Sequence, residues 1–405
     1  MSFREQFEIP AKYKLWSMIL MGVGLVSILG GYFMYGTGDE HHVARFWGTL
    51  LYNSVFFLLV VNASMFFICA TTMAMGGWQM AFRRVTEAIS FAVIPMGIIS
   101  GVILLALVFG HQHHIYHWLT PGDDKILLGK AGFLNPTFFT VWTTLSIVGW
   151  IFLGAKMRSI SKELDESGQL SVEEGKKYIF KNTIWGSLFL VWFGLTVMST
   201  VPWLWLMSID AHWYSTMYSW YTFASTFVAG MALITLFVIY LKNQGYLELV
   251  NDEHLHDLGK FMFAFSVFWT YLWFSQYMLI WYANIPEETV YFKHRVQGPY
   301  RGVFFLNLVI NFLAPLLILM RRSSKRNYTL LVFMSALIIC GHWLDFYQMV
   351  IASISKEHVE LNFFDFGVAA GFVGLIMWST GIALTKRSLI AKNHPFFKES
   401  IIHHT

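Results

Sequence analysis

The sequence predicts an all-α polytopic membrane protein with ten transmembrane helices. Of its 405 residues, 56% are hydrophobic, 18% are aromatic and only 13% are charged, whereas soluble domains carry about 25% charged residues. Apolar stretches recur along the whole chain, and each is long enough to cross a hydrocarbon core, which takes about 20 helical residues. These stretches are continuous and lack the alternation of barrel strands, so helices must form the spans.

The ten predicted spans follow one another without a soluble domain or a Gly/Ser/Pro linker, so residues 1–405 are predicted to form a single membrane domain. The first span is predicted to be retained, because its end at Gly30, Gly31 and Tyr32 lacks the small-residue cleavage pattern of a signal peptide. The predicted ranges are 15–34, 51–75, 86–109, 137–155, 183–206, 216–241, 260–282, 302–320, 329–351 and 365–385.

The distribution of basic residues predicts the orientation of these spans. Of the 28 Lys and Arg residues, 21 lie at the termini and in the even-numbered connections, including those between Lys156 and Lys181. By the positive-inside rule, both termini are predicted to be cytoplasmic. The formal net charge of +4 then reflects this topology and contact with anionic membrane lipids, and gives no reason to expect a nucleic acid partner.

The order of the spans permits an internal repeat. Spans 2 and 6 both start on the outer side, after aromatic-rich connections around Tyr52 and Tyr218. We therefore expect two four-helix bundles, formed by spans 2–5 and 6–9, with spans 1 and 10 at the periphery. The long outer connection 110–136 could fold over the bundle or bind another subunit.

Span 9 contains the clearest ionisable pair of the chain, His342 and Asp345, whose spacing places both on one helix face. At about 1.5 Å per residue they lie about 20 Å and about 24 Å from the inner edge of the span. Such groups usually line a proton, ion or substrate path, so we predict a proton-handling or quinone-head-group site. The alternative is a structural pair that ties span 9 to a neighbour. No Lys or Arg is expected within the spans, so Asp345 needs protonation, water or a neutral hydrogen-bond partner.

Glu87 is a candidate for the inner end of such a proton path. It opens span 3 directly after Arg83 and Arg84, close to the inner surface. A helix N-terminus favours an acid there, so a structural cap or salt bridge is the main interpretation. A proton uptake point is the alternative, since Asp345 lies toward the opposite surface.

Four more residues are candidates for the same path or quinone site. Asp210 and His212 lie in the short outer connection before span 6, where helix capping is the alternative role. Gln276 in span 7 and Tyr347 in span 9 are polar groups within the membrane. They could line a hydrated route or hold neighbouring helices together.

No redox cofactor or metal site is predicted for the chain itself. Cys69 and Cys340 lie within spans, where packing is their expected role, and no haem-attachment, iron–sulfur, Walker or Rossmann motif occurs. His342 is the only histidine well inside the membrane, so bis-histidine haem ligation lacks a second ligand. A solvated or subunit-contacting role, in preference to copper or zinc binding, is predicted for the histidines of one outer connection: His111, His113, His114 and His117.

Several longer stretches resemble a known family. These stretches are His256–Lys260, Phe268–Tyr271, Phe274–Tyr277, Trp281–Thr289, Asp210–Thr216 and His342–Tyr347. In them the chain resembles the NrfD-like, or polysulfide-reductase-like, membrane subunits of alternative complex III, and the resemblance covers most of spans 2 to 10. The length is most similar to that of the shorter of the two related ten-span subunits, the ActF-like quinone-binding subunit 2.

The resemblance implies a subunit of a quinol:cytochrome c (or oxidase) oxidoreductase in the bacterial inner membrane, without catalysis of its own. It implies partner subunits that hold the haem and iron–sulfur clusters: an iron–sulfur protein, c-type cytochromes and a paralogous NrfD-like subunit. Quinol or menaquinol is the small molecule it suggests. A proton path, a quinone-site-like cavity and a scaffolding role all stay open for this chain. A secondary transporter and a purely structural membrane anchor are the rival interpretations.

Overall fold

The computed structural model describes residues 4–168, 170–356 and 358–404, and in these ranges the chain forms helices and no strand. Within these ranges, nine helical segments are long and apolar enough to cross a membrane. The protein is therefore an all-α polytopic membrane protein, as predicted. The nine segments are α1 with η1 (Ala11–Gly36), α2 (Glu40–Met73), α3 with α4 (Arg83–Phe109), α6 (Pro136–Glu166), α7 to α8 (Val172–Trp205), α9 (Met217–Asn243), α12 to α13 (Arg301–Leu319), α14 (Tyr328–Ile354) and α15 (Phe363–Thr385).

Several of these segments are made of more than one helix. Their parts are α1 (Ala11–Gly31) and η1 (Tyr32–Gly36), α3 (Arg83–Phe91) and α4 (Val93–Phe109), α7 (Val172–Leu195), η4 (Thr196–Thr200) and α8 (Val201–Trp205), and α12 (Arg301–Leu308), η6 (Val309–Leu313) and α13 (Ala314–Leu319). The connections contain η2 (Trp78–Ala81), η3 (His117–Leu119), α5 (Lys125–Gly129), η5 (Met207–Asp210), α11 (Pro286–Val296), η7 (Ser324–Arg326) and α16 (Phe397–Ile401).

The seventh predicted span, 260–282, lies in α10 (Asp252–Ala283), a helix of 32 residues that packs against α9 and α14. Its membrane-length stretch is rich in Trp and Tyr, including Trp269, Tyr271 and Trp273. Hydropathy scales rate these rings as weakly polar, although they are common in membrane helices near the interface. By its length and its place in the bundle, α10 adds a tenth long helix to the nine segments found in the described ranges.

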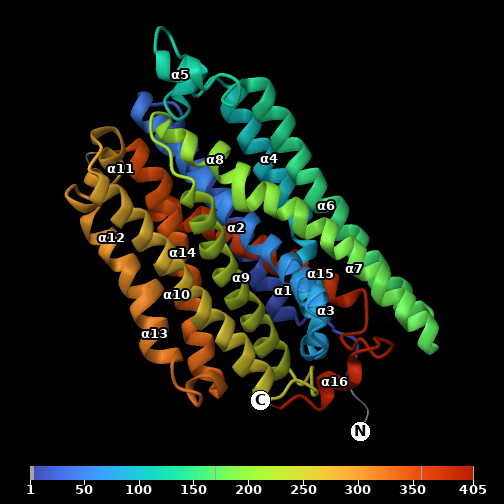
Figure 1. Ribbon diagram of the computed structural model, residues 1–405. Helices are drawn as coiled ribbons and strands as arrows, with labels where there is room; N and C mark the ends of the chain where they lie inside the picture. Colours follow the sequence, from blue (N-terminus) through green and yellow to red (C-terminus); the bar gives the residue numbers. More distant parts are fainter. Residues whose placement is uncertain (1–3, 169, 357, 405) are drawn as a thin grey trace.

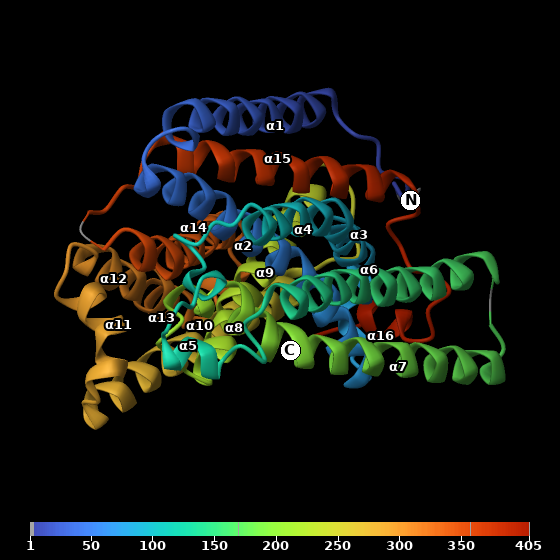
Figure 2. The same cartoon turned by 90° about the horizontal axis from the view of Figure 1, so that it is seen from above.

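The long helices form two groups of four with one pair outside them (Figures 1 and 2). The first group contains α2, α3 with α4, α6, and α7 with α8, and the second contains α9, α10, α12 with α13, and α14. Helices α1 and α15 pair with each other, and α15 also contacts α2 and α3. This arrangement agrees with the predicted two bundles and two peripheral spans.

Close backbone contact joins the peripheral pair. A Cβ atom added to Gly24 of α1 would lie 2.4 Å from the Cα atom of Gly371 of α15, so only glycine fits at this crossing. Small residues at crossing points let membrane helices gain van der Waals contact without a hydrophobic driving force. The outward face of α1 is exposed and apolar, with Leu25 and Val26 among its side chains.

Both chain ends lie at one end of the bundle, which we call the terminal face; α5 and α11 lie at the other end, the opposite face (Figure 1). The predicted inner connections are shorter than expected, because helices extend beyond the apolar ranges. Helix α6 continues to Glu166, and α7 begins at Val172 with a capping box between Ser171 and Glu174. Most of the connection between Lys156 and Lys181 is therefore helical.

Arg45 lies outside the predicted span 51–75 but inside a helix. Helix α2 begins at Glu40, well before the predicted start at residue 51, and Asp39 caps it by accepting a hydrogen bond from His42 N at 3.0 Å. Arg45 consequently lies inside α2 and is fully buried. A prediction from hydropathy leaves a helical turn that contains a charged residue out of the span. The turn can still belong to the helix when an opposite charge is buried beside it.

Two of the spans contain a π-helical segment a few residues before a proline. The π-helical segments η4 and η6 begin at Thr196 and Val309, and each starts six residues before a proline, Pro202 or Pro315. Proline has no amide hydrogen to donate to the carbonyl four residues earlier, and a π-helical turn is one way to accommodate that loss. Both segments stay helical, so neither span has the unwound backbone typical of transporter sites.

The C-terminal segment 386–404 crosses the terminal face and contacts both bundles. Ser400 Oγ accepts a hydrogen bond from Ala81 N at 2.9 Å and lies 3.1 Å from His254 Nε2 of α10. Leu389 N donates to Glu5 O at 2.7 Å, which joins the two ends of the chain. The segment therefore links η2, α10 and the N-terminal residues across this face.

His394 makes this C-terminal segment sensitive to acid. Its side chain is buried against Tyr178, and its Nδ1 atom accepts a hydrogen bond from Phe396 N at 3.2 Å, which requires an unprotonated nitrogen. Burial, and to a smaller extent the charge of Arg83, lowers the pKa of His394 well below its ordinary value. The unfolded imidazole takes up a proton near pH 6.5 and the folded one does not, so this contribution to stability is present above about pH 6.5 and is lost as the pH falls below it.

We expect the thermal stability of the protein to fall as the pH is lowered from about 7.5 to about 5.5, and His394→Gln to remove part of that dependence. The His394 contribution is at most about 1.4 kcal/mol per pH unit. Unfolding curves of both proteins at several pH values measure it. An identical pH dependence in the two proteins would contradict this role.

Candidate functional site

Asp345 of α14 lies in the middle of the second bundle and is buried. Its carboxylate accepts hydrogen bonds from Tyr221 Oη and, at 3.2 Å, from Ser225 Oγ, both of α9, and from Trp269 Nε1 of α10 at 3.2 Å. All three donors are neutral. A carboxylate buried in this way is stabilised by its hydrogen bonds, which offset part of the cost of removing it from water. Neutral hydrogen-bond partners were one of the three means of burial predicted for Asp345, and these contacts confirm it.

His342 lies one helical turn earlier and shares Ser225 with Asp345. Its Nδ1 atom is 2.9 Å from Ser225 Oγ, and its ring meets the Trp269 ring edge-on, with centroids 5.3 Å apart. The side chain is fully buried, and within the described ranges Nε2 has no hydrogen-bond partner. The two ionisable groups thus face the same side of α14, as their spacing predicted.

The shared hydroxyl couples the protonation of the two groups. Ser225 has one hydroxyl hydrogen, so it donates either to Asp345 or to His342 Nδ1 and never to both. When Ser225 donates to Asp345, the hydrogen between Ser225 and His342 must come from the imidazole. When Ser225 donates to His342, a hydrogen between Ser225 and Asp345 must come from a protonated carboxyl. A change of protonation at Asp345 therefore changes the hydrogen-bonding state of His342.

A small polar cavity lies directly beside Asp345. It has a volume of about 20 Å³, and its wall includes Tyr221, Gln276, Arg295 and Gln348 as well as Asp345. Within the described ranges, Gln276 Nε2, Gln348 Nε2 and Arg295 Nε have no protein partner. A polar cavity of this size holds one water molecule with several hydrogen-bond partners. Sites for ligands of the size of a quinone are about 300 Å³ or larger, so this cavity is suited to water.

Arg295 of α11 was not predicted as part of the site. It is buried, its guanidinium lies over the Tyr291 ring at 3.5 Å, and NH2 donates to Ser353 Oγ at 2.7 Å. Arg295 lines the same cavity as Asp345. It comes from α11, in a connection, and so lies outside the predicted spans, in which no Lys or Arg was expected. The sequence signal for Arg295 is weak: it is a basic residue four positions after Tyr291, in an outer connection rich in aromatic residues.

Asp210 continues the polar groups toward the opposite face. It is the last residue of η5, its carboxylate accepts a hydrogen bond from Ser353 Oγ, and Oδ2 lies 4.0 Å from Arg295 NH2. The side chain is about one-fifth exposed. The carboxylate does not cap a helix, which was the alternative. Asp345, the cavity, Arg295, Ser353 and Asp210 form a continuous set of polar groups, which we call the outward route.

His212 takes no part in the outward route. Its Nε2 atom lies 2.6 Å from Asp124 Oδ2, and its side chain is 56% exposed. This hydrogen bond holds the pKa of the Asp124 carboxyl below its ordinary value. The contact fastens the outer connection 110–136, which includes Asp124, to the connection before α9, and Lys130 Nζ does the same by donating to Ala211 O at 2.6 Å. That outer connection folds over the first bundle.

Glu87 is paired with two arginines in the first bundle. It accepts hydrogen bonds from Arg83 Nε at 3.0 Å, from Arg84 NH1 at 2.7 Å and from Ser161 Oγ of α6 at 2.7 Å. Arg84 also donates to Asp165 of α6. This is the salt-bridge role that the sequence favoured, and it joins α3 to α6. The structure does not bring Glu87 together with the Asp345 cluster.

Tyr347 lies on another face of α14, beside a buried ion pair that sequence reasoning missed. Asp365 of α15 accepts a hydrogen bond from Arg45 NH2, from Tyr52 Oη at 2.8 Å and from Thr49 Oγ1 at 3.2 Å. The Tyr347 ring packs against Tyr52 and lies under the Arg45 guanidinium at 5.9 Å. The available signal was Asp365 itself, the third residue after Asn362 in a capping box at the start of α15.

The predicted outer histidines are solvent-facing or lie near acids of neighbouring segments. His114 Nδ1 is 3.6 Å from Glu40 Oε2, and its ring is 4.0 Å from that of His113. In the part of the chain that the structure describes, no three His, Cys, Asp or Glu side chains are grouped to hold a metal ion.

The fold and the site together define the class of the protein: an all-α polytopic membrane protein with a buried aspartate–histidine pair and an outward polar route in its second helix bundle. Comparison of the chain with models of protein families and with curated proteins finds no match.

Proposed function

We propose that this chain is the NrfD-like, ActF-like membrane subunit of a respiratory quinol:cytochrome c (or oxidase) oxidoreductase, and that its second bundle carries protons between Asp345 and the opposite face. The observation that carries the proposal is the Asp345 carboxylate, held by three neutral donors beside a water-sized cavity that leads to Asp210. The resemblance of the stretches around Asp210, His256 and His342 to that family supports the choice of complex.

The chemistry of the outward route favours proton transfer. Asp345 and His342 both exchange protons, and their coupling through Ser225 gives the pair two hydrogen-bonding states. A water in the cavity can pass a proton between Asp345 and the groups nearer the surface. Arg295 donates hydrogen bonds and accepts none, so its part is to hold Ser353 and Asp210 in place and to stabilise a negative Asp345.

The small size of the cavity beside Asp345 supports a quinol site elsewhere in the proposed complex. The cavity beside Asp345 has room for a water and not for a quinone ring. We therefore assign electron transfer, with its haem and iron–sulfur clusters, to the partner subunits: an iron–sulfur protein, c-type cytochromes and a paralogous NrfD-like subunit that binds quinol or menaquinol. A purely structural anchor is disfavoured because three buried nitrogens around the cavity have no partner among the described protein residues.

The proposed complex has a definite place and orientation. We propose the bacterial inner membrane, with the terminal face toward the cytoplasm, because 21 of the 28 Lys and Arg residues belong to the termini and to the connections on that side. Asp210 and α11 then face the periplasm. Protons released at Asp345 would then leave on the periplasmic side, where the c-type cytochromes of the proposed complex would act.

Affinity purification of the tagged full-length chain from its native membrane tests this assignment. We expect c-type haem absorbance, iron–sulfur electron paramagnetic resonance signals and quinol:cytochrome c oxidoreductase activity to co-purify in constant ratio to the chain. A cytoplasmic helical protein with the same tag serves as the control. A chain that purifies stably without haem, clusters or activity would contradict the proposal.

A further inference from the structure

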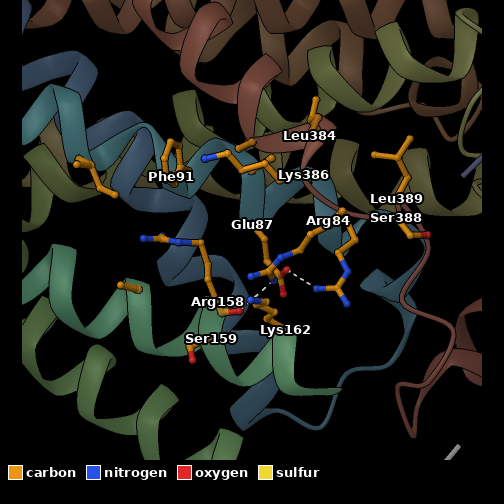
Figure 3. Close-up of a pocket in the computed structure, with 15 residues that line it drawn as sticks. Arg84, Glu87, Phe91, Arg158, Ser159, Lys162, Leu384, Lys386, Ser388 and Leu389 are labelled. Carbon is orange, nitrogen blue, oxygen red and sulfur yellow. Dashed lines mark hydrogen bonds and ion pairs between the residues drawn. The ribbon is translucent and has the colours of Figure 1, made fainter. Parts of the chain in front are cut away.

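A second cavity, separate from the outward route, opens at the terminal face beside Glu87 (Figure 3). Its volume is about 320 Å³, and its wall comes from α3, the start of α4, α6 and the end of α15 with the residues that follow it. Five of the lining side chains are basic and one is acidic. The basic residues are Arg84, Arg158, Lys162, Lys386 and Arg387.

Three of the five cations have no carboxylate within ion-pair distance among the described residues. Arg158 NH1 donates to Ser90 O at 3.2 Å, Arg387 NH1 donates to Arg158 O at 3.0 Å, and the Lys386 ammonium lies over the Phe91 ring at 4.9 Å. These contacts hold the side chains in place without neutralising them. The charges of Arg84 and Lys162, by contrast, are paired with Glu87, Asp165 and Glu166.

Three cationic side chains that are fixed in position around one cavity, those of Arg158, Lys386 and Arg387, attract an anion with several negative oxygens. Guanidinium groups bind phosphate oxygens through charge-assisted hydrogen bonds, and an ammonium adds a point charge. Without such an anion, the three positive charges repel one another in a partly dehydrated space. The polar part of the cavity is therefore suited to a phosphate group.

The rest of the wall is apolar and continues onto the surface that faces lipid. Phe91, Ile94, Ala155 and Leu384 line the cavity. Beyond Ile94, the apolar surface of α4 continues with Ile98 and Val102, which are 59% and 63% exposed. On α6, Phe152 is 58% exposed. A ligand with a phosphate in the basic part and hydrocarbon chains along α4 and α6 satisfies both halves of the site.

We propose that this cavity binds the phosphate head group of an anionic phospholipid from the leaflet at the terminal face. Basic pockets between membrane helices on the inner side bind the head groups of anionic lipids by the same combination of charge and apolar contact. The proposal also gives the buried Glu87 a role. Together with Asp165, Glu87 holds Arg84 in the wall by ion pairs, and the cations of the cavity that have no carboxylate partner among the described residues are available to bind the ligand. This inference does not depend on the proposed respiratory function.

Lipid binding to the purified full-length chain, with whatever subunits remain bound, tests the proposal. The protein is placed in micelles doped with phosphatidylglycerol or with phosphatidylcholine, and bound lipid is measured by native mass spectrometry, with the thermal unfolding midpoint as a second readout. We expect phosphatidylglycerol to be retained and stabilising, and phosphatidylcholine to be neither. The double variant Lys386→Gln, Arg387→Gln should bind it about tenfold or more weakly.

The matched control removes the same charge from exposed lysines of α7 at the same face, Lys176→Gln with Lys177→Gln, and should bind lipid as the wild type does. Equal retention of phosphatidylglycerol by the two double variants would overturn the site. No preference of the wild type for phosphatidylglycerol over phosphatidylcholine would overturn it as well, even if a variant failed to fold. If inorganic phosphate alone stabilised the protein to the same extent in phosphatidylcholine micelles, the ligand would be a soluble phosphate and the lipid assignment would be wrong.

Discussion

Asp345→Asn is expected to slow quinol oxidation by the proposed complex by about 10²-fold and to abolish the proton release that depends on this chain. Positioned acid–base groups typically contribute rate factors of about 10² to 10⁴. The asparagine has nearly the same shape and can accept hydrogen bonds from Tyr221 and Trp269, so the subunit should fold and assemble. It cannot bind or release a proton at physiological pH. Turnover and proton release of the purified complex in proteoliposomes measure the effect.

Two further variants show whether an effect belongs to the outward route. Tyr221→Phe removes one of the three donors to Asp345 and should give an intermediate loss. Asn62→Leu serves as the matched control, because Asn62 is a fully buried amide of α2 outside the route; its turnover should equal that of the wild type. Wild-type turnover and proton release in Asp345→Asn would remove any essential role of the carboxylate.

Arg45→Met is expected to lower the free energy of unfolding by about 3–5 kcal/mol, the usual cost of breaking a buried ion pair by removing one partner. Both Arg45 and Asp365 are fully buried. Without the guanidinium, the Asp365 carboxylate keeps only neutral or backbone donors, which include Tyr52 and Thr49. The pair joins α2 to α15, so the peripheral helices should loosen first.

The double variant Arg45→Met, Asp365→Leu should recover most of that loss, because the buried Asp365 charge is then removed together with its partner. Glu360, whose Oε2 atom lies 3.2 Å from Arg45 Nε, also loses this partner, but its side chain is 28% exposed. Arg301→Met, at an exposed position at the start of α12, is the control for removing one positive charge and should change stability by less than about 0.5 kcal/mol. Chemical unfolding in detergent measures all three proteins. A double variant no more stable than Arg45→Met would show that the charge itself is not what destabilises the single variant.

The spans could be predicted from the sequence because a helix must place about 20 apolar residues in the membrane wherever it crosses. The shared face of His342 and Asp345 also followed from local geometry, since residues three apart meet on one side of a helix. Tyr347 shows the limit of that reasoning. It is only two residues from Asp345, but a helix turns about 200° over two residues, so the two side chains have different neighbours.

The partners of Asp345 could not be predicted, because they depend on which faces of distant helices meet. Tyr221 and Ser225 lie one turn apart on α9 and resemble many other polar residues of the spans. Arg295 and Asp210 lie in connections, and no local pattern shows that a connection folds back into the bundle. For Glu87 the spacing from Arg83 and Arg84 allowed both an ion pair and a proton uptake point, and only the contact with Ser161 of α6 shows how the carboxylate is held.

Infrared spectroscopy of the carboxyl group tests the central claim most directly. If Asp345 takes up and releases protons through the outward route, the purified protein should show a pH-dependent carbonyl band of a protonated carboxyl that is absent from Asp345→Asn. That band should shift quickly when H₂O is replaced by D₂O, and the shift should be slower in Asp210→Asn, which alters the surface end of the route. A spectrum in which Asp345→Asn removes no band at any pH, or in which Asp210→Asn exchanges as fast as the wild type, would contradict the account.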